Sequence, residues 1–228
     1  MRAAALLVAA GRGERFGGAI PKGFTELAGR PLLAHAVEAA VSCPGIERVV
    51  VAVSEKMVER ARASLEHPLV EVVVGGETRQ ASVLAALEAV GPGPDLIVCH
   101  DAARPLAPPA LFATVLRALV DSGADGAIPI VAIPDTVKRI EGASVAGTLD
   151  REALGLAQTP QAFRRSALEH AHRMAAEEGF EGTDDSALLE RAGFAVVAIA
   201  GDPRNLKVTT RADLALAEVA LEDRFELG

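Results

Sequence analysis

The stretch Ala3-Ala4-Ala5-Leu6-Leu7-Val8-Ala9, followed at once by Ala10-Gly11-Arg12-Gly13-Glu14-Arg15-Phe16, decides the fold of this 228-residue chain. Its first part is a continuous apolar run, which is typical of a strand buried on both faces of a parallel sheet. Its second part is a basic turn with two glycines, and a Pro21-Lys22 pair follows. Because glycine has no Cβ, the backbone N–H groups of such a turn can approach a ligand closely. The whole stretch predicts a polyphosphate site at the end of a first strand.

Apolar runs of the same kind alternate with amphipathic segments along the chain. The expected strands are 3–9, 48–53, 70–74, 96–99, 126–132 and 195–200. The expected helices are 32–42, 56–65, 78–90, 108–122, 164–178, 184–192 and 211–221. This order predicts an α/β fold with a mostly parallel open sheet, in which ligands bind beyond the carboxyl ends of the strands. The loops after residues 9, 74, 99 and 200 are therefore where we expect a site.

Residues 134–154 interrupt this alternation. Two weakly alternating segments flank a turn near Gly142, which predicts a β-hairpin. An isolated hairpin is only marginally stable in water, so we expect it to pack against its own domain or a second subunit. The prediction is one domain over residues 1–228, with 134–154 as an inserted β-arm.

The composition excludes several classes of protein. A net charge of −8 and an aromatic content of 3%, without Trp or Tyr, argue against a nucleic-acid-binding protein. Cys43 and Cys99 are far apart in the sequence, which favours buried thiols in a reducing compartment over a disulfide or a zinc site. No apolar run reaches membrane-spanning length. We therefore expect a cytoplasmic protein that binds neither membrane nor nucleic acid.

Glycine-rich nucleotide motifs are a poor match to the first loop. The pattern Gly11-x-Gly13-x-x-Phe16 has Phe16 where a dinucleotide fingerprint needs its third glycine. The segment that ends in Pro21-Lys22-Gly23 lacks the Lys-Ser/Thr end of a P-loop. NAD binding and a P-loop NTPase are both disfavoured.

Three later segments carry polar residues to expected strand ends. After the strand at 70–74, Thr78 is expected to cap a helix and Arg79 to lie exposed near the loop. After the strand at 96–99, Asp101 stands where a carboxylate could hold Mg²⁺, with Arg104 close behind. Lys207 follows the last strand, and Thr183 is expected to be an ordinary helix N-cap.

Taken together, these segments resemble the 2-C-methyl-D-erythritol 4-phosphate cytidylyltransferases of the non-mevalonate isoprenoid pathway. The similarity spans nearly the whole chain. Many nucleotidyltransferases share the first loop, whereas His100-Asp101-Ala102-Ala103-Arg104-Pro105 and Asp135-Thr136-Val137-Lys138 are more selective. The resemblance implies a three-layer Rossmann-like nucleotidyltransferase fold and a homodimer in which the arm clasps the partner. It also implies transfer of the cytidylyl group of CTP to methylerythritol phosphate, with Mg²⁺ as cofactor.

The resemblance also implies roles for individual residues. Catalytic cations would be Arg15, Lys22 and Lys207. The nucleotide would be bound by Ala9, Ala10, Gly11, Gly13, Gly76, Arg79 and Ser82. The polyol phosphate would be bound by Asp101, Arg104, Thr136, Arg151, Thr159 and Thr183. Of these, Thr136 and Arg151, with Arg104 as a further candidate, would act either in their own chain or across the dimer. The metal ligand would be Asp101.

One position departs from the family pattern. Relatives often have an acidic residue before Asn205, where this chain has Arg204. A second carboxylate near the metal would then have to come from Asp202. Two other functions stay open: a cytidylyltransferase for ribitol 5-phosphate or another polyol phosphate, and a nucleotide-binding module without catalysis.

Overall fold

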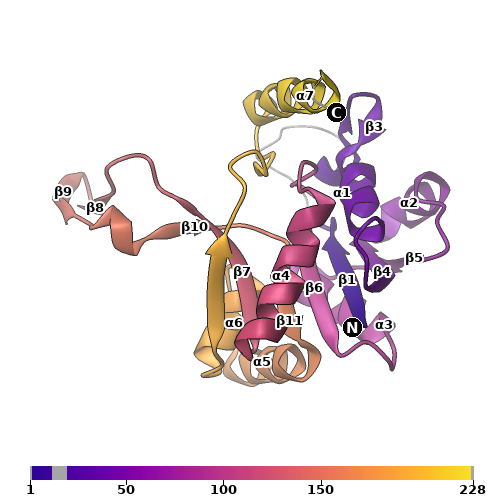
Figure 1. Cartoon of the computed structure of the whole chain (residues 1–228), viewed down its shortest axis with the longest axis horizontal. Helices are drawn as coiled ribbons and strands as arrows, with labels where there is room; N and C mark the ends of the chain where they lie inside the picture. The colour runs from indigo at the N-terminus through magenta and orange to yellow at the C-terminus, as the bar shows by residue number, and fades with distance from the viewer. Residues whose placement is uncertain (1, 12–19, 227–228) are drawn as a thin grey trace.

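Eight strands form the central sheet of the protein, whose computed structural model describes residues 2–11 and 20–226, with backbone alone for 223–226 (Figure 1). The strands follow the order β5-β4-β1-β6-β11-β7, and β10 and β12 also pair with β7. Pairing is parallel except at β10 and β11, which run against their neighbours. Their bounds are β1 (Ala3–Val8), β4 (Ile46–Val53), β5 (Val70–Val74), β6 (Leu96–Asp101), β7 (Gly126–Ala132), β10 (Gly155–Ala157), β11 (Gln161–Arg164) and β12 (Val196–Ala200).

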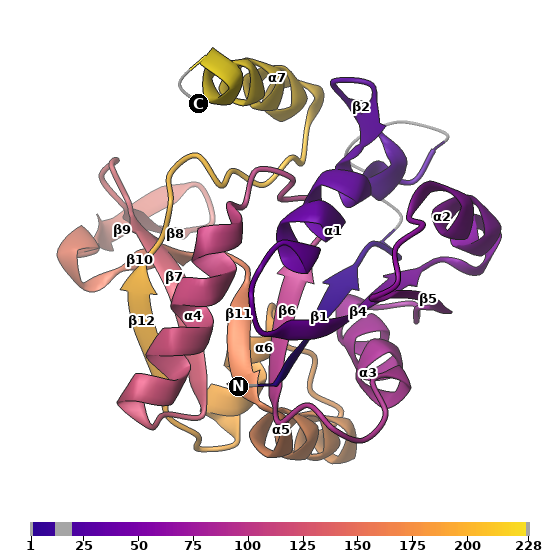
Figure 2. The same ribbon diagram turned by 45° about the vertical axis from the view of Figure 1, so that its right-hand side comes forward.

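Helices cover both faces of this sheet (Figures 1 and 2). One face packs against α1, α2 and α4, and the other against α3, α5 and α6. The bounds are α1 (Leu32–Val41), α2 (Val58–Ser64), α3 (Arg79–Ala89), α4 (Pro109–Ser122), α5 (Arg165–Glu178), α6 (Asp185–Arg191) and α7 (Arg211–Glu226). Short 3₁₀ turns lie at η2 (Lys22–Phe24), η3 (Glu55–Met57) and η4 (Arg151–Ala153). The predicted three-layer α/β class with a mostly parallel sheet is confirmed.

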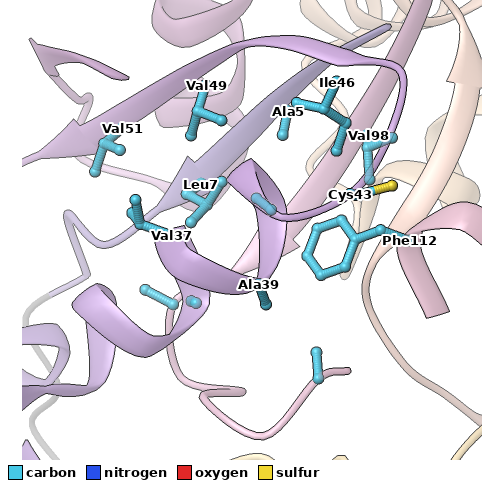
Figure 3. Packing of buried hydrophobic residues seen from close by; sticks show 14 of the residues in the cluster. Ala5, Leu7, Val37, Ala39, Cys43, Ile46, Val49, Val51, Val98 and Phe112 are labelled. Atoms are coloured by element: carbon cyan, nitrogen blue, oxygen red, sulfur yellow. The ribbon is translucent and has the colours of Figure 1, made fainter. Parts of the chain in front are cut away.

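The first strand divides its side chains between two cores. Leu7 points to the α1 and α4 side, where Val37 and Phe112 pack in the same cluster (Figure 3). Leu6 points to the α3 and α5 side and joins Leu168 there. Because successive strand residues face opposite sides, a strand buried on both faces must be apolar throughout. Full burial of one such leucine contributes about 1.5–3 kcal/mol to folding.

A short antiparallel strand separates β6 from β7, and the apolar pattern did not predict it. β11 pairs Gln161 with Cys99 on β6 and Ala162 with Ala127 on β7. A cis peptide bond joins Thr159 to Pro160 just before it. The insertion brings Thr159 next to the end of β6, beside Asp101.

The predicted hairpin is present as an arm that projects from the sheet (Figure 1). Its strands β8 (Lys138–Glu141) and β9 (Ser144–Thr148) pair only with each other among the described strands. Gly142 takes a φ of +60° in the turn, which glycine adopts without strain. Ile140 and Val145 are 65% and 66% exposed. These two residues are paired on one face, and the neighbours of Ile140 on β8, which face the other way, are exposed as well, so both faces of the hairpin are open in the single chain.

Of the two expected helix caps, one is confirmed and one is wrong. Thr78 caps α3, and its hydroxyl oxygen accepts from the Ala81 N–H at 3.1 Å. At α6 the cap is Asp184 rather than Thr183: a carboxylate oxygen of Asp184 accepts from the Ala187 N–H at 3.0 Å. Aspartate is preferred over threonine at this position, so the helix begins one residue later than a threonine cap would allow.

The C-terminal helix α7 packs at the edge of the molecule, near a small hairpin of β2 (Glu26–Leu27) and β3 (Arg30–Pro31). A third apolar cluster joins Leu27, Leu106, Val208 and Ala217 there.

Both cysteines are buried and unpaired, as predicted. Within the described parts of the chain, no helix is both long and apolar enough to cross a bilayer.

Candidate active site

A cavity of about 300 Å³ opens at the carboxyl edge of the sheet, where β1 and β6 end side by side. Its wall comes from the loop after β1, from η2, from the first turns of α3, from the end of β6 and from the segment after β12. The lining residues are Val8, Ala9, Ala10, Gly11, Lys22, Gly23, Arg79, Ser82, Asp101, Ala102, Ala103 and Lys207. This is the edge of the sheet at which an α/β protein is expected to bind its ligand.

Close backbone packing shapes one side of the cavity. A Cβ on Gly75 would stand 2.8 Å from the Ala10 Cβ and 2.9 Å from the Ser82 hydroxyl oxygen. Only glycine therefore lets the loop after β5 lie against the loop after β1. The Ser82 hydroxyl donates to the Thr78 carbonyl at 2.8 Å, which fixes its oxygen at the cavity wall.

A carboxylate between two cations forms the polar centre of the cavity. One oxygen of Asp101 accepts from the Arg79 Nε at 3.0 Å, and the other accepts from the Lys207 Nζ at 2.6 Å. Burial alone would raise the pKa of Asp101, but the adjacent Arg79 and Lys207 outweigh it and hold this pKa well below its usual range. Asp101 is therefore ionised at neutral pH.

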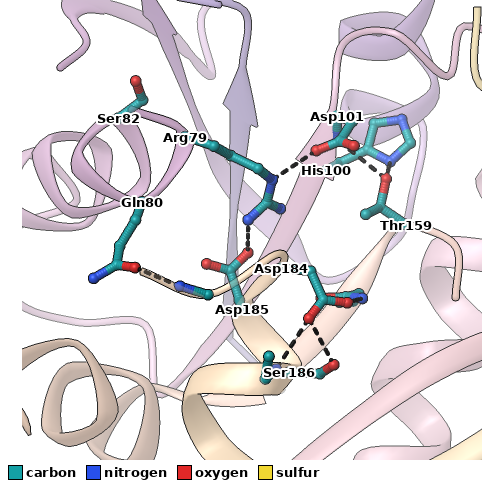
Figure 4. A network of polar contacts seen from close by, with 12 residues as sticks. Arg79, Gln80, Ser82, His100, Asp101, Thr159, Asp184, Asp185 and Ser186 are labelled. Carbon is teal, nitrogen blue, oxygen red and sulfur yellow. Dashed lines mark hydrogen bonds and ion pairs between the residues drawn. The ribbon is translucent and has the colours of Figure 1, made fainter. Parts of the chain in front are cut away.

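A buried histidine holds the backbone of Asp101 in place. The His100 Nε2 lies 3.2 Å from the Arg104 carbonyl, which can only accept, so Nε2 carries the proton. Nδ1 then accepts from the Thr159 hydroxyl at 2.9 Å, and the oxygen of that hydroxyl accepts from the Asp101 N–H at 3.0 Å (Figure 4). Burial lowers the pKa of His100 to about 4, so the ring is neutral in this arrangement.

Behind the cavity, Arg79 also contacts a second carboxylate. Its Nη1 lies 2.8 Å from an Asp185 oxygen, and Figure 4 shows the guanidinium between Asp101 and Asp185. The expectation that Arg79 lies exposed near the loop is wrong, because its side chain is only 24% exposed and its charge is held by two acids. His172 lies 3.4 Å from the other Asp185 oxygen. Neither Asp185 nor His172 was predicted as a site residue; the acidic pair at 184–185 is the only sequence signal for Asp185, and His172 has none.

Half of the predicted site residues line this cavity together. They are Ala9, Ala10, Gly11, Lys22, Arg79, Ser82, Asp101 and Lys207. Gly76 lies beside it, and its carbonyl lies 3.2 Å from the Ser82 hydroxyl oxygen. Gly13 and Arg15 lie outside the described residues. The assigned roles of all these residues stay predictions.

The residues predicted for the polyol phosphate do not line the cavity, apart from Asp101. Arg104 is partly buried and donates to the Asn205 and Ala157 carbonyls at 2.8 and 3.2 Å. Thr159 is 4% exposed, and its hydroxyl is used inside the protein. Thr136 and Arg151 are exposed on the arm, and Thr183 is exposed before α6.

The donor set at the cavity fits a magnesium ion that arrives with a ligand rather than a preformed metal centre. Asp101 is the one carboxylate among the described lining residues, and both of its oxygens already accept from cations. The described part of the chain contains no group of three or more His, Cys, Asp or Glu side chains placed to hold a metal. Mg²⁺ commonly takes one carboxylate and completes its shell with phosphates and water.

Arg204 holds Asp202 away from this role. The Arg204 Nη2 lies 3.0 Å from one Asp202 oxygen, and its backbone N–H donates to the other at 2.9 Å. Asp202 does not line the cavity. A second carboxylate at the metal therefore does not come from Asp202 in this arrangement.

Comparison with known proteins agrees with the geometry. The sequence profile of the 2-C-methyl-D-erythritol 4-phosphate cytidylyltransferase family, IspD, matches residues 3–223. A relative of that name from Cereibacter sphaeroides is 45% identical over 223 residues, which cover 96% of each chain. The bifunctional enzyme IspD/IspF of Rhodospirillum rubrum is 44% identical over 220 residues, which are 95% of this chain and 56% of that enzyme. The chain thus spans about half the length of this bifunctional relative.

A solved structure agrees as well. The 4-diphosphocytidyl-2C-methyl-D-erythritol synthase of Anaerococcus prevotii is similar with a TM-score of 0.87 and 26% identity, covering 97% of this chain and 96% of that one. The match therefore spans nearly the whole of both chains. This chain belongs to the 2-C-methyl-D-erythritol 4-phosphate cytidylyltransferase family.

Proposed function

We propose that this chain transfers the cytidylyl group of CTP to 2-C-methyl-D-erythritol 4-phosphate, producing CDP-methylerythritol and pyrophosphate. The observation that carries the proposal is the convergence of Lys22, Lys207 and Asp101 on one cavity at the carboxyl edge of the sheet. Family membership over residues 3–223 supports the choice of substrates.

The reaction is an in-line displacement at the α-phosphorus of CTP. An oxygen of the acceptor phosphate forms the new P–O bond, and the bond from the α-phosphorus to the bridging oxygen breaks as pyrophosphate leaves with the electron pair. The acceptor phosphate is already a nucleophile, so no general base is needed. The protein contributes position and charge stabilisation.

The cavity supplies those two contributions from different sides. The cations of Lys22 and Lys207 stabilise the charge that builds up on the phosphoryl oxygens, and Arg15 is predicted to join them. The narrow wall of Ala9, Ala10 and Ser82 receives the base. A slot lined by small side chains and backbone favours a pyrimidine over the larger purine.

Magnesium is part of this proposal. Asp101 would hold the ion, which would supply charge neutralisation for the leaving pyrophosphate. The contacts of Asp101 with Arg79 and Lys207 keep its carboxylate ionised and fixed in direction. The other ligands would be phosphate oxygens and water.

The acceptor side is proposed to be completed by a second subunit. Arg151 and Thr136 lie on an arm that projects from its own sheet, and neither lines the cavity of its own chain (Figure 1). The arm exposes the apolar side chains of Ile140, Val145 and Leu149, of which Leu149 is 41% exposed. Exposed apolar side chains of this kind can be buried against a second copy. Sedimentation of wild type against Ile140→Asp tests this: we expect a dimer that Ile140→Asp weakens, and a wild-type monomer contradicts it.

We propose that the protein is cytoplasmic, and two buried free cysteines, which are compatible with a reducing compartment, support this location. A cysteine-based disulfide is not required for any part of the site. Fractionation of the source cells with an antibody against the chain tests this location, and recovery outside the cytoplasm contradicts it.

Pyrophosphate release tests the proposed reaction. CTP, UTP, ATP and GTP are each paired with methylerythritol 4-phosphate, ribitol 5-phosphate and a hexose phosphate, in the presence and absence of Mg²⁺. We expect release only with CTP, methylerythritol 4-phosphate and Mg²⁺ together. Release with ribitol 5-phosphate alone identifies a different acceptor, and no release with any pair favours a binding module without catalysis.

A further inference from the structure

Asp185 is the most deeply buried acid near the cavity and does not touch it. Its side chain is 1% exposed, and it is not among the cavity-lining residues. It therefore cannot contact a ligand in the cavity directly. A buried carboxylate costs several kcal/mol in desolvation unless it is paired, so its presence calls for a partner.

The local structure of α6 does not need this carboxylate. Asp184 already caps the helix, and one of its oxygens accepts from both the Ala187 N–H and the Ser186 hydroxyl. Asp185 stands in the first turn, where its charge suits the helix dipole, but an exposed acid would do the same. Its burial against other elements is what requires an explanation.

Two basic side chains from those other elements lie against Asp185. Arg79, at the start of α3, lies 2.8 Å from one Asp185 oxygen, and His172, on α5, lies 3.4 Å from the other. Burial alone would raise the pKa of Asp185, but the adjacent Arg79 and His172 hold it below its usual range. The carboxylate is therefore an anion fixed between α3, α5 and α6.

Asp185 fixes the direction in which the Arg79 guanidinium points. Its Nε donates to Asp101 while its Nη1 forms an ion pair with Asp185 at 2.8 Å, so the guanidinium is held by two carboxylates at once. Without Asp185, a flexible arginine at a cavity built for phosphates would be free to turn toward the triphosphate. Held on both sides, it stays against Asp101 and leaves the phosphates to Lys22 and Lys207.

We propose that Asp185 is a positioning residue, which, with His172 behind it, fixes the Arg79 guanidinium so that Arg79 orients Asp101 instead of binding the nucleotide phosphates. This inference rests on the proposed function for its catalytic consequence. The orientation of the Arg79 guanidinium in the unliganded protein does not depend on that function.

The matched pair of variants is Asp185→Asn and Asp184→Asn. Both make the same chemical change at neighbouring residues of one helix start, and asparagine still caps α6 at position 184. We expect Asp185→Asn to lower kcat roughly 10-fold to 100-fold, as loss of a supporting partner commonly does, while the Kd for CTP in calorimetry does not rise, because a released Arg79 can add a contact to the triphosphate. Asp184→Asn should keep wild-type kcat. Unchanged kcat in folded Asp185→Asn overturns the proposal.

A double-mutant cycle separates action through Arg79 from general loss of structure. In an Arg79→Gln background, Asp185→Asn should have no further effect on kcat, because the group through which it acts is gone. The doubly substituted protein also carries no unpaired buried charge, so it remains measurable if Asp185→Asn alone does not fold. A further fall in kcat from Arg79→Gln to the double variant overturns the proposal.

A readout without substrate distinguishes failure of this inference from failure of the proposed function. Hydrogen exchange of the Arg79 Nε–H, followed by NMR on ¹⁵N-arginine-labelled protein, reports the contact with Asp101 directly. We expect slow exchange in wild type and Asp184→Asn, and exchange at least about 10-fold faster in Asp185→Asn. Equal exchange in wild type and Asp185→Asn overturns the positioning role, even if the wild-type enzyme is active. Inactive wild type with the expected exchange pattern overturns the proposed function alone.

Discussion

The rim of the cavity, formed by Lys22, Asp101 and Lys207, differs from the arm in how its side chains are partnered within the chain. At the rim, Asp101 is 7% exposed and its carboxylate is held by cations from two other segments. On the arm, Ile140 and Val145 are exposed, and the two strands pair only with each other among the described strands. The rim is thus organised by one chain alone, whereas the arm lacks a covering surface.

This difference separates two parts of the proposed reaction. Charge stabilisation at the α-phosphorus needs groups that are fixed before the substrate arrives, and the rim has them. Recognition of the acceptor is proposed to depend on residues of the arm, which a second subunit would cover. We therefore expect variants at the rim to change turnover and variants on the arm to change use of the acceptor.

The largest effect is expected at the rim. Lys22→Ala should fold normally and lower kcat by about 10²–10³, because one preorganised cation is lost from the transition state. Lys138→Ala, the same change on the arm, should keep near-wild-type kcat. Steady-state pyrophosphate release measures both, with circular dichroism to check folding. Near-wild-type turnover in Lys22→Ala removes this lysine from the mechanism.

The next effect concerns the arm. Arg151→Ala should raise the KM for methylerythritol phosphate roughly 10-fold while the Kd for CTP stays the same, because Arg151 is assigned to the acceptor alone. If the arm acts across the dimer, mixing inactive Lys22→Ala with Arg151→Ala subunits should restore part of the activity. One site of each mixed dimer then has both residues intact.

Two results would contradict this assignment of Arg151. Equal losses for CTP and for the acceptor would place the residue outside the acceptor side. Mixed subunits that exchange, as shown by a tag on one variant, but regain no activity would place Arg151 in the site of its own chain.

Acid pH should lower the stability of the fold through His100, whose ring supports the backbone of Asp101 at the cavity. The pKa of His100 falls on folding from its ordinary value of 6.5 to about 4, because burial disfavours the charged ring. The unfolded chain then binds the proton more readily, so stability is complete above pH 6.5 and is lost as the pH falls toward 4. The difference between these two pKa values corresponds to about 3 kcal/mol in the free energy of unfolding.

Urea unfolding at several pH values between neutral and acid measures this loss, with His100→Gln as the control. The control should show a flatter pH dependence over the same interval, since its side chain does not titrate. Carboxylates such as Asp101 and Asp185, whose pKa values are lowered on folding, add their own loss only at more acid pH. The same pH dependence in both proteins would show that His100 is not its source.

The elements that were predictable share a local signal. The strand at Val70–Val74 has the predicted bounds, because four of its five residues are valine, whose β-branched side chain favours a strand whatever its partner is. Thr78 was predictable as a cap for the same reason, since a cap contacts only its own helix. Lys22, Asp101 and Lys207 could be assigned to one edge of the sheet because each follows an expected strand.

What could not be predicted depends on partners far away in the sequence. β11 has four residues, and it is a strand because β6 and β7 pair with it on either side. Arg79 was expected to be exposed because its partner Asp185 is more than a hundred residues away and is brought near by the packing of α3 and α6. Burial of a charge is a property of the assembled fold, and no local pattern reveals it.

The smallest effect tests whether the arm folds together with the core. Thr78 caps α3, and Asp150 caps η4 within the arm, where its carboxylate accepts from the Glu152 N–H at 3.0 Å. Thr78→Ala should lower the free energy of global unfolding by about 1 kcal/mol, because α3 packs on the sheet and melts only with it. Asp150→Ala removes an equivalent bond from an exposed segment, so it should leave global unfolding unchanged in the monomer and speed hydrogen exchange in residues 134–154 alone. If both substitutions lowered global stability equally, the arm would be part of the cooperative core, and its open surfaces would need an explanation other than a missing partner.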